Sequence, residues 1–409
     1  MMSDPVWQLP YQRSHEVAGL AGGLVFVGGA GDFDGVGALR HPGNLEAQLG
    51  GALDNVEAAL GIEGCGLGDA VRIKLFYAPD SGMNEWEILA AIHDRVGCQP
   101  APAITANPVP MQPFAGQLVQ IQAIAQKGWR ENADVRVVSE PVPQAHAGLF
   151  GVPVLTRGLR AGEFFSVPGR TAAGDDDTVP TDNGTEQTHI VMQRLQDTLT
   201  GLGATFQDAI KKEGYYFGTD METWAGMAAT RASYFREPAA PATVVPCQRL
   251  YPDGAQTKVE VLGYREEWNG FDKYIPRDDS WPKRVWDWPI PVPYRQGSRL
   301  RGSIWTGGQV PFEPGFNGGA AVYPGDLLRQ TRYTMSYVDE ILRGFGAVSS
   351  DLRLLVCYFT SDGSQGATEK FLDAVADSVA GPLPPITCVP QPLMHNDEMT
   401  VEIWGVAKA

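Results

Sequence analysis

The chain has 409 residues, 20% of them charged, and a formal net charge of −16 at pH 7. A chain of this length is expected to form about two to four domains rather than one core. Its acidic surface repels phosphate backbones and its basic residues are scattered, so we expect no nucleic-acid partner. There is no basic-then-apolar leader pattern and no apolar run near the roughly 20 residues that span a bilayer, so we expect a cytoplasmic protein without a membrane partner.

The cysteine and histidine patterns indicate neither disulfides nor a metal site. The five cysteines are an odd number without a CxxC pair, so reduced thiols that act as small buried hydrophobes are expected. The six histidines lack metal-ligand spacing such as HxxxH. Neither GxGxxG after a strand nor GxxxxGKS/T occurs, so we expect no metal and no cofactor.

An internal repeat organises the chain. A strand followed by a glycine turn occurs three times, and the second glycines of these turns are Gly29, Gly169 and Gly308. Their spacings are 169 − 29 = 140 and 308 − 169 = 139 residues. An aspartate that begins a later strand recurs at steps of 139 and 143 residues, as Asp69, Asp208 and Asp351. This agreement predicts three tandem domains of one design.

The first copy shows the expected order of elements. An apolar strand leads into the glycine turn within residues 24–31. Asn44 can cap a helix whose apolar residues recur at helical spacing until Gly61. An alternating strand at 69–77, a second helix at 84–96 and a closing strand at 118–125 complete a β, α, β, α, β unit.

The second and third copies repeat this order. The later elements of the second copy are a strand at 208–217, a helix at 221–235 and a strand at 258–264. Those of the third copy are a strand at 351–359, a helix at 367–379 and a strand at 400–407. We therefore divide the chain into domains 1–128, 147–264 and 293–409, a linker at 129–146 and a strap at 265–292.

The strap is rich in tryptophan and proline, a composition too aromatic for a flexible linker. We interpret it as packed across the second and third domains. The alternative is that some of its tryptophans wall a ligand pocket. These tryptophans are Trp268, Trp281, Trp286 and Trp288.

Several motifs together resemble one known family. They are the Gly-Gly-Gln-Val-Pro turn at 307–311, the ALDNVEAAL helix at 52–60, the Asp-led strands and the closing Val-Glu-Ile at 401–403. The chain resembles the Rid family, the YjgF-type reactive-intermediate deaminases also called L-PSP proteins. The resemblance covers about nine-tenths of the chain in three copies.

The resemblance implies an α+β fold of three tandem Rid-like (chorismate-mutase-like) domains, each a mixed sheet with two helices on one face. Family members form homotrimers that bind small molecules between subunits. An intrachain pseudo-trimer with three non-equivalent clefts and a small-molecule substrate is therefore implied. Tethering lets each cleft diverge independently.

The family's substrate-binding arginine has no counterpart here. In deaminating members it lies in a Pro-Ala-Arg-Ser type motif and holds the substrate carboxylate, for which a bidentate guanidinium is suited. The corresponding positions are Pro102, Pro241 and Pro384. This departure argues against the usual 2-imino-acid deamination in every cleft.

The resemblance also assigns catalytic positions on the last strand of each copy. The family has a glutamate near the attacking water, which is matched by Glu402 and Glu260 and, in the first copy, by Gln120. A buried carboxylate there can act as general base, whereas Gln120 can only orient the water. The alternative is that both glutamates are structural.

Four further positions are assigned to substrate binding. Tyr294 matches the aromatic residue at the pocket mouth, and Gly308 and Gln309 match the turn that faces the ligand. Arg170 occupies the Gln309 position of the second copy. It either replaces the missing carboxylate anchor or lies in a surface loop.

Charged residues alternate on the Asp-led strands. Arg72 and Lys74 share one face of their strand, and Lys211 and Glu213 are their counterparts. We expect a solvated strand face, and the alternative is that these side chains line a cleft.

The resulting functional hypothesis is cofactor-free hydrolysis of a C–N bond (imine, enamine or amide) in a small nitrogen-containing metabolite at an interdomain cleft. One alternative is a ring-opening amidohydrolase of the barbiturase type, although the repeated Ser and Lys positions of such enzymes are missing. Another is a catalytically inactive ligand-binding or protein-interacting pseudo-trimer. Open clefts with convergent polar groups would favour catalysis, and filled clefts would favour the inactive protein.

Overall fold

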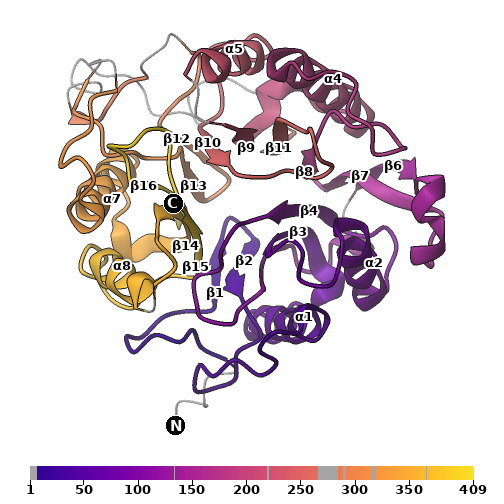
Figure 1. The fold of residues 1–409 in the computed structure, drawn as a ribbon, viewed down its shortest axis with the longest axis horizontal. Coiled ribbons are helices and arrows are strands. Elements are labelled where there is room, and N and C mark those ends of the chain that lie inside the picture. Colours follow the sequence, from indigo (N-terminus) through magenta and orange to yellow (C-terminus); the bar gives the residue numbers. More distant parts are fainter. Residues whose placement is uncertain are drawn as a thin grey trace.

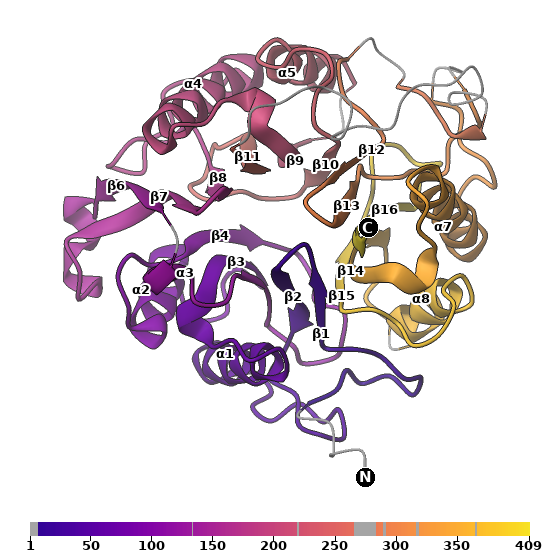
Figure 2. The same cartoon turned by 180° about the vertical axis from the view of Figure 1, so that it is seen from behind.

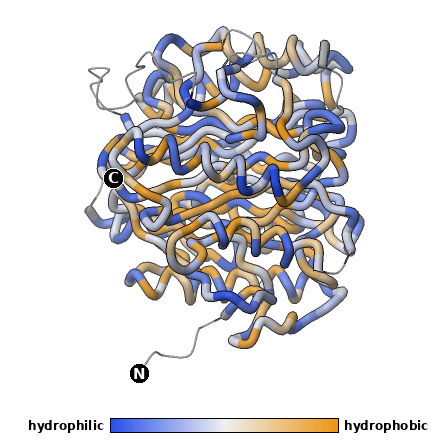
Figure 3. The backbone as a smooth tube through the Cα atoms, turned by 90° about the vertical axis from the view of Figure 1, so that its left-hand side faces the viewer, coloured by the Kyte–Doolittle hydropathy of each residue, from blue (hydrophilic) through white to orange (hydrophobic). Residues whose placement is uncertain are grey.

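The computed structural model describes residues 7–132, 134–218, 221–265, 284–288, 292–315, 319–364 and 366–409. Three sheets lie around one centre, and the long helices are at the periphery (Figures 1 and 2). Many of the apolar segments run through the middle of the molecule (Figure 3). The predicted α+β class and the three copies of one domain design are confirmed.

The first sheet has the strand order β1-β2-β5-β3-β4, in which only β3 and β4 are parallel neighbours. Its outer side carries α1 and α2 (Figure 1). Asn44 caps α1 as predicted, since its side chain accepts a hydrogen bond from the N–H of Ala47. The elements are β1 (Ala18–Ala21), β2 (Leu24–Ala30), α1 (Leu45–Ile62), β3 (Ala70–Tyr77), α2 (Glu85–Val96), β4 (Ala103–Pro108) and β5 (Val119–Ala125), followed by the short α3 (Trp129–Asn132).

The second sheet repeats this order and adds one edge strand, giving β10-β9-β11-β8-β7-β6. Its elements are β6 (Val135–Pro141), β7 (Val154–Ala161), β8 (Phe164–Arg170), α4 (Gly184–Leu202), β9 (Ala209–Phe217), α5 (Met221–Ala232), β10 (Ala242–Cys247) and β11 (Thr257–Tyr264). β6 lies within residues 129–146, where the sequence predicts a linker, and it pairs antiparallel with β7. This segment is therefore part of the second sheet, and its half-exposed alternating side chains suit an edge strand.

The third sheet has the order β12-β13-β16-β14-β15, which is the order of the first sheet. Its elements are β12 (Gly297–Leu300), β13 (Ser303–Thr306), α7 (Leu327–Gly344), β14 (Leu352–Thr360), α8 (Ala367–Ala376), β15 (Ile386–Gln391) and β16 (Val401–Lys408). No helix in the described ranges is long and apolar enough to cross a membrane.

The repeated aspartates have a local structural role. Each closes a single 3₁₀ turn by accepting a hydrogen bond from the N–H three residues earlier, at distances of 2.9, 2.8 and 3.0 Å. This capping holds the chain where it leaves the first helix of the domain and enters β3, β9 or β14. The recurrence of Asp69, Asp208 and Asp351 therefore reflects a turn that each domain needs.

A buried ion network joins the first and second sheets. Arg72 and Lys74 of β3 contact Glu213 of β9 and Glu260 of β11, and all four side chains are at most 2% exposed. Burial alone would raise the pKa of Glu260, but the two cations outweigh it and lower this pKa to about 2. The predicted solvated strand face is wrong, because the neighbouring domain supplies carboxylates that the sequence of one strand does not reveal.

We expect the substitution Glu213→Gln to leave Arg72 and Lys74 with one carboxylate between them. An uncompensated buried charge costs about 3–5 kcal/mol, so the free energy of unfolding from urea denaturation should fall by roughly this amount. The matched control is Glu57→Gln, whose partner Arg95 is 38% exposed, and its effect should stay within about 1 kcal/mol. Equal losses in the two variants would contradict the assigned role of the network.

Candidate active site

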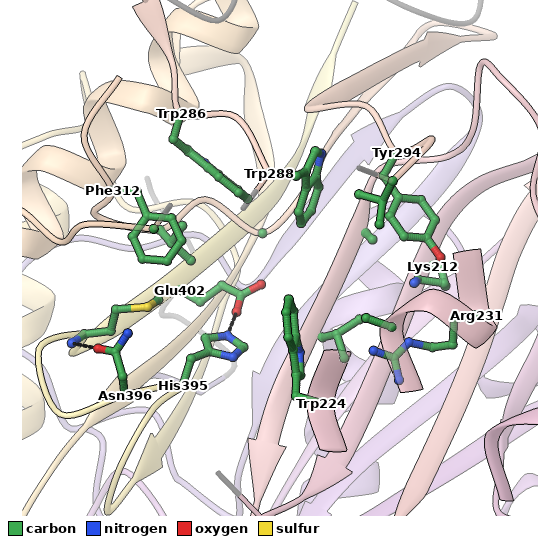
Figure 4. A pocket seen from close by; sticks show the side chains of 18 residues that line it. Lys212, Trp224, Arg231, Trp286, Trp288, Tyr294, Phe312, His395, Asn396 and Glu402 are labelled. Atoms are coloured by element: carbon green, nitrogen blue, oxygen red, sulfur yellow. Dashed lines mark hydrogen bonds and ion pairs between the residues drawn. The ribbon is translucent and has the colours of Figure 1, made fainter. Parts of the chain in front are cut away.

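A cavity of about 110 Å³ lies between the second and third domains. The second domain contributes side chains from β9, α5 and β10, and the third contributes the β13 turn, the loop before β16 and β16 itself (Figure 4). A volume of this order is comparable with cavities that hold one six-membered ring. The side chains labelled in Figure 4 are Lys212, Trp224, Arg231, Trp286, Trp288, Tyr294, Phe312, His395, Asn396 and Glu402.

Glu402 forms the acidic side of the cavity together with a histidine. Glu402 Oε2 is 2.8 Å from Nε2 of His395, and Nδ1 of His395 is 2.8 Å from the Tyr216 hydroxyl. Burial raises the pKa of Tyr216, so this hydroxyl stays protonated and can donate to Nδ1. In neutral His395 the proton then resides on Nε2 and is donated to the carboxylate.

Gly308 lets the backbone pass directly beside this carboxylate. A Cβ at residue 308 would lie 1.8 Å from Glu402 Oε1, which no side chain can tolerate. The N–H of Gly308 donates to the carbonyl of Ala242 in the second domain at 2.8 Å. The turn predicted to face the ligand thus positions Glu402 and ties the two domains together.

Two cations lie across the cavity from Glu402 (Figure 4). Lys212 of β9 and Arg231 of α5 are 1% and 2% exposed. Neither has a carboxylate partner in the described ranges, and Nε and Nη1 of Arg231 lack any hydrogen-bond partner there. Burial, with a contribution from Arg231, lowers the pKa of Lys212 well below its usual range. Buried unpaired cations are costly, so their presence indicates a site for an anion.

Aromatic side chains form most of the remaining wall. The ring of Tyr294 lies 3.9 Å from Lys212 Nζ, close enough for a cation–π contact. The indole N–H of Trp286 donates to Gln309 Oε1 at 3.0 Å. Gln309 therefore positions Trp286 in the wall and does not itself line the cavity. Trp286 and Trp288 confirm that part of the strap walls a pocket, whereas Trp268 and Trp281 lie outside the described residues.

Strand register places a different residue opposite the glycine turn of the second domain. In the third domain Glu402 pairs with Tyr358, which lies seven residues after Asp351. In the second domain the residue seven positions after Asp208 is Tyr215, and it pairs with Lys258. Gly169 also approaches Lys258, as Gly308 approaches Glu402. Lys258 therefore occupies the position that the sequence assigns to Glu260. The offset is two residues, which keeps the same strand face and so escapes a pattern-based alignment.

Glu260 is accordingly separate from the acidic cavity. Its carboxylate accepts from Arg72 and from the hydroxyl of Thr105, and it belongs to the buried ion network. The interpretation of Glu260 as a structural carboxylate agrees with these contacts, while Glu402 has the open position that the catalytic interpretation requires.

Gln120 lies at the equivalent position between the first and third domains. Its amide donates to the carbonyl of Cys388 at 2.7 Å, and its Oε1 lies where a Cβ on Gly29 would be. The adjacent Gln122 donates to Thr387 at 3.1 Å. These polar contacts tie the two domains together around Gln120.

Arg170 lies in a second cavity, between the first and second domains, and is ion-paired with Glu140. It is not among the side chains around Glu402, so those two predicted residues do not act in one site. Tyr294 and Glu402 do share a cavity. Within the described ranges no group of three or more His, Cys, Asp or Glu side chains is arranged to hold a metal ion.

Sequence reasoning missed three important residues of the cavity: Lys212, Arg231 and His395. The run Lys211-Lys212 inside an apolar strand was a usable signal, because lysine is rarely buried without a partner. Arg231 and His395 gave no local signal, since a helix end and a loop bring them to the site from different domains.

Comparison with known proteins agrees with this architecture. Residues 154–264 match the family described as Endoribonuclease L-PSP, and no curated protein sequence matches the chain. A solved chorismatase structure is 14% identical with a TM-score of 0.52, over 83% of this chain and 93% of that one. A YjgF-family protein from Mycobacterium tuberculosis is 22% identical with a TM-score of 0.26, over 32% of this chain and 100% of that one. E. coli TdcF, solved with bound serine, is 22% identical with a TM-score of 0.27, over 34% and 98%.

The fold and the interdomain cavity define a protein of three Rid-like domains in one chain. Residues 154–264 of the second domain match the L-PSP family, which confirms the resemblance to the Rid (YjgF, L-PSP) family.

We expect the substitution Gly308→Ala to displace the Glu402 carboxylate from His395. The new Cβ would occupy the present place of Oε1, so the Glu402–His395 separation in a crystal structure of the variant should exceed roughly 3.5 Å. Gly50→Ala is the matched control, because a Cβ there meets nothing within 4 Å and alanine favours helix α1. An unchanged Glu402–His395 contact in G308A would contradict this account.

Proposed function

We propose that this chain is a cofactor-free hydrolase that cleaves a C–N bond in a small anionic metabolite held between its second and third domains. One observation carries the proposal. A carboxylate paired with an imidazole faces two buried cations that lack carboxylate partners, across a cavity walled by aromatic rings. Convergent polar groups in a mostly apolar cavity are typical of a catalytic site.

Glu402 is the proposed general base, and His395 is the group that orients it. Ionised Glu402 accepts the Nε2 proton of His395 with one oxygen and has its other oxygen at the Gly308 turn. A water beside it can give up a proton to the carboxylate while its oxygen attacks an imine or amide carbon. With an amide, this proton then passes to the departing nitrogen, and a carboxylic acid and an amine are released. With an imine, the first proton passes to the nitrogen to give a carbinolamine. The carboxylate then takes the proton of its hydroxyl and passes it to the nitrogen as the C–N bond breaks, so that a carbonyl compound and an amine are released.

Lys212 and Arg231 are the proposed anchors for the anionic end of the substrate. Strands β4, β10 and β15 carry no arginine, so the anchor of the deaminating family members is missing from its usual strand. β9 and α5 supply cations from another direction. The unpartnered indole N–H of Trp224 and hydroxyl of Tyr294 add donors for oxygen atoms of the same ligand.

The chorismatase neighbour supports a second candidate, a hydrolase that acts on chorismate. The structural match covers 83% of this chain and 93% of that one, and a carboxylate substrate would suit the two cations. Chorismate is therefore assayed beside the imines and amides. The barbiturase-type alternative has little support, because the ammonium of Lys74 is occupied by Glu213 and Glu260.

The inactive-protein alternative would fit a chain whose clefts are all filled, and the open cavity beside Glu402 argues against it. We further propose that the domains 1–128, 147–264 and 293–409 form an intrachain pseudo-trimer in which only this cleft is catalytic. β6 is then assigned to the second domain.

We expect Glu402→Gln to lower turnover by about 100-fold or more, since a positioned general base contributes roughly 10²–10⁴. Ammonia release from imines and amides and the loss of chorismate would be followed for the wild type and the variant. The matched control is Glu46→Gln on the exposed first turn of α1, which should keep full activity. Wild-type turnover in E402Q, or turnover of no compound by the wild type, would refute the hydrolase.

We expect anion binding in this cavity to take up a proton. The pKa of free Lys212 is depressed by burial and by Arg231, and a bound carboxylate favours its charged form. Above the depressed pKa of the free protein, affinity for a carboxylate should therefore fall by up to about tenfold per pH unit.

Calorimetric titration with benzoate, a flat carboxylate, measures this uptake. Titrations in two buffers of different ionisation enthalpy give the number of protons bound. Lys212→Met should abolish the uptake, while Arg231→Lys keeps a cation and should retain part of the affinity. Binding of benzoate without proton exchange at every pH would contradict the assigned role of Lys212.

A further inference from the structure

The cavity between the first and second domains is lined by three arginines, Arg157, Arg170 and Arg194. Its volume is about 220 Å³. It is bounded by α2 of the first domain and by β6, β7, β8 and α4 of the second, which lie side by side in Figures 1 and 2. It is the counterpart of the Glu402 cavity, since Gly169 and Lys258 here stand in the places of Gly308 and Glu402.

Lys258 takes the place of Glu402 in this cavity and is held by two partners. Its ammonium donates to the carbonyl of Ala106 at 2.6 Å and pairs with Glu85 at 3.3 Å. Glu85 in turn accepts from the hydroxyl of Tyr77 at 3.0 Å. Lys258, which holds these two contacts, therefore does not supply here the carboxylate that Glu402 supplies in the other cavity.

The carboxylates around the cavity are mostly committed to other partners. Glu140 pairs with Arg170, and Glu85 pairs with Lys258. Asp177 accepts from the indole of Trp86 at 3.1 Å and from Tyr251 at 2.9 Å, and it also contacts His146. Asp175 contributes a more distant negative charge near Arg194.

Arg157 and Arg194 lack an ion pair within the described ranges. Arg157 donates to the carbonyl of Arg194, and Arg194 donates to the carbonyls of Thr171 and Ala173. Burial lowers the pKa of Arg194, and the neighbouring Arg157 lowers it further. Two adjacent guanidiniums that are held by backbone carbonyls leave positive charge directed into the cavity.

We propose that this cavity binds a second anionic ligand, a metabolite with a phosphate or carboxylate group. Arg157 and Arg194 are the anchors, and Arg170 lies close enough to affect the charge of Arg194. Guanidinium groups suit both anions because their N–H donors match planar and tetrahedral oxygen pairs. The proposal does not depend on the hydrolase activity of the other cleft.

The experiment titrates the full chain with inorganic phosphate and, separately, with succinate, by calorimetry and by ligand-induced change in Tm. Two charge-assisted contacts correspond to a dissociation constant on the order of 1 mM. Arg157→Met should weaken binding by about tenfold or more, and Arg157→Lys should weaken it less. Preference for phosphate or for succinate identifies the anion class, and saturable binding of either that depends on Arg157 supports the site.

Two control variants separate this site from other anion effects. Lys212→Met removes an anion anchor of the Glu402 cavity, so the binding that remains in this variant and is lost when Arg157→Met is added to it belongs to the second cavity. Arg343→Met removes an exposed arginine that pairs with Asp339 and should have no effect. The proposal is overturned if neither anion binds saturably at about 10 mM, if R157M binds as the wild type does, or if binding is lost in K212M.

Discussion

Close backbone approach at three glycine turns is the constraint on which the arrangement of the molecule depends. At Gly29, Gly169 and Gly308 the turn touches the side chain on the last strand of its own sheet. At Gly169 and Gly308 the backbone N–H also donates to the neighbouring domain, at 2.8 Å in both cases. A side chain at any of these positions would displace the side chain that the turn touches. The turns therefore fix the sheet register, the domain contacts and the position of the central polar residue together.

The equivalent position on the last strand of each domain has a different environment in each of the three domains. Gln120 is bonded to the backbone of the next domain, Lys258 is paired with Glu85, and Glu402 is left beside an open cavity with His395. In a homotrimer one gene would dictate the same residue at all three places. A single chain removes that restriction, so the amide can connect domains and the ammonium can balance a carboxylate while Glu402 stays beside an open cavity. Fold alone would not have distinguished these roles.

Local and periodic features were predictable from the sequence, and contacts between distant segments were not. The repeat, the helix caps and the Asp-led strands follow from spacing within one domain, and the structure confirms them. The role of Glu260 could not be predicted, because Lys258, which holds the equivalent position, lies two residues away and therefore on the same face of the strand. The burial of Arg72 and Lys74 depends on carboxylates more than 130 residues away in the chain. The cavity of Glu402 is likewise assembled from two domains, so the sequence alone does not show that Lys212 and Arg231 line the same cavity as Glu402.

The unpaired cations of that cavity also bear on how long the protein survives in a cell. Lys212 and Arg231 are buried without a carboxylate partner in the described ranges, at a cost to the folded state that the proposed anion would relieve. Any ligand that binds the native chain and not the unfolded one lowers the population open to proteases. Under the proposed function, molecules without the anion would be degraded first, and the abundance of the protein would follow the supply of that anion.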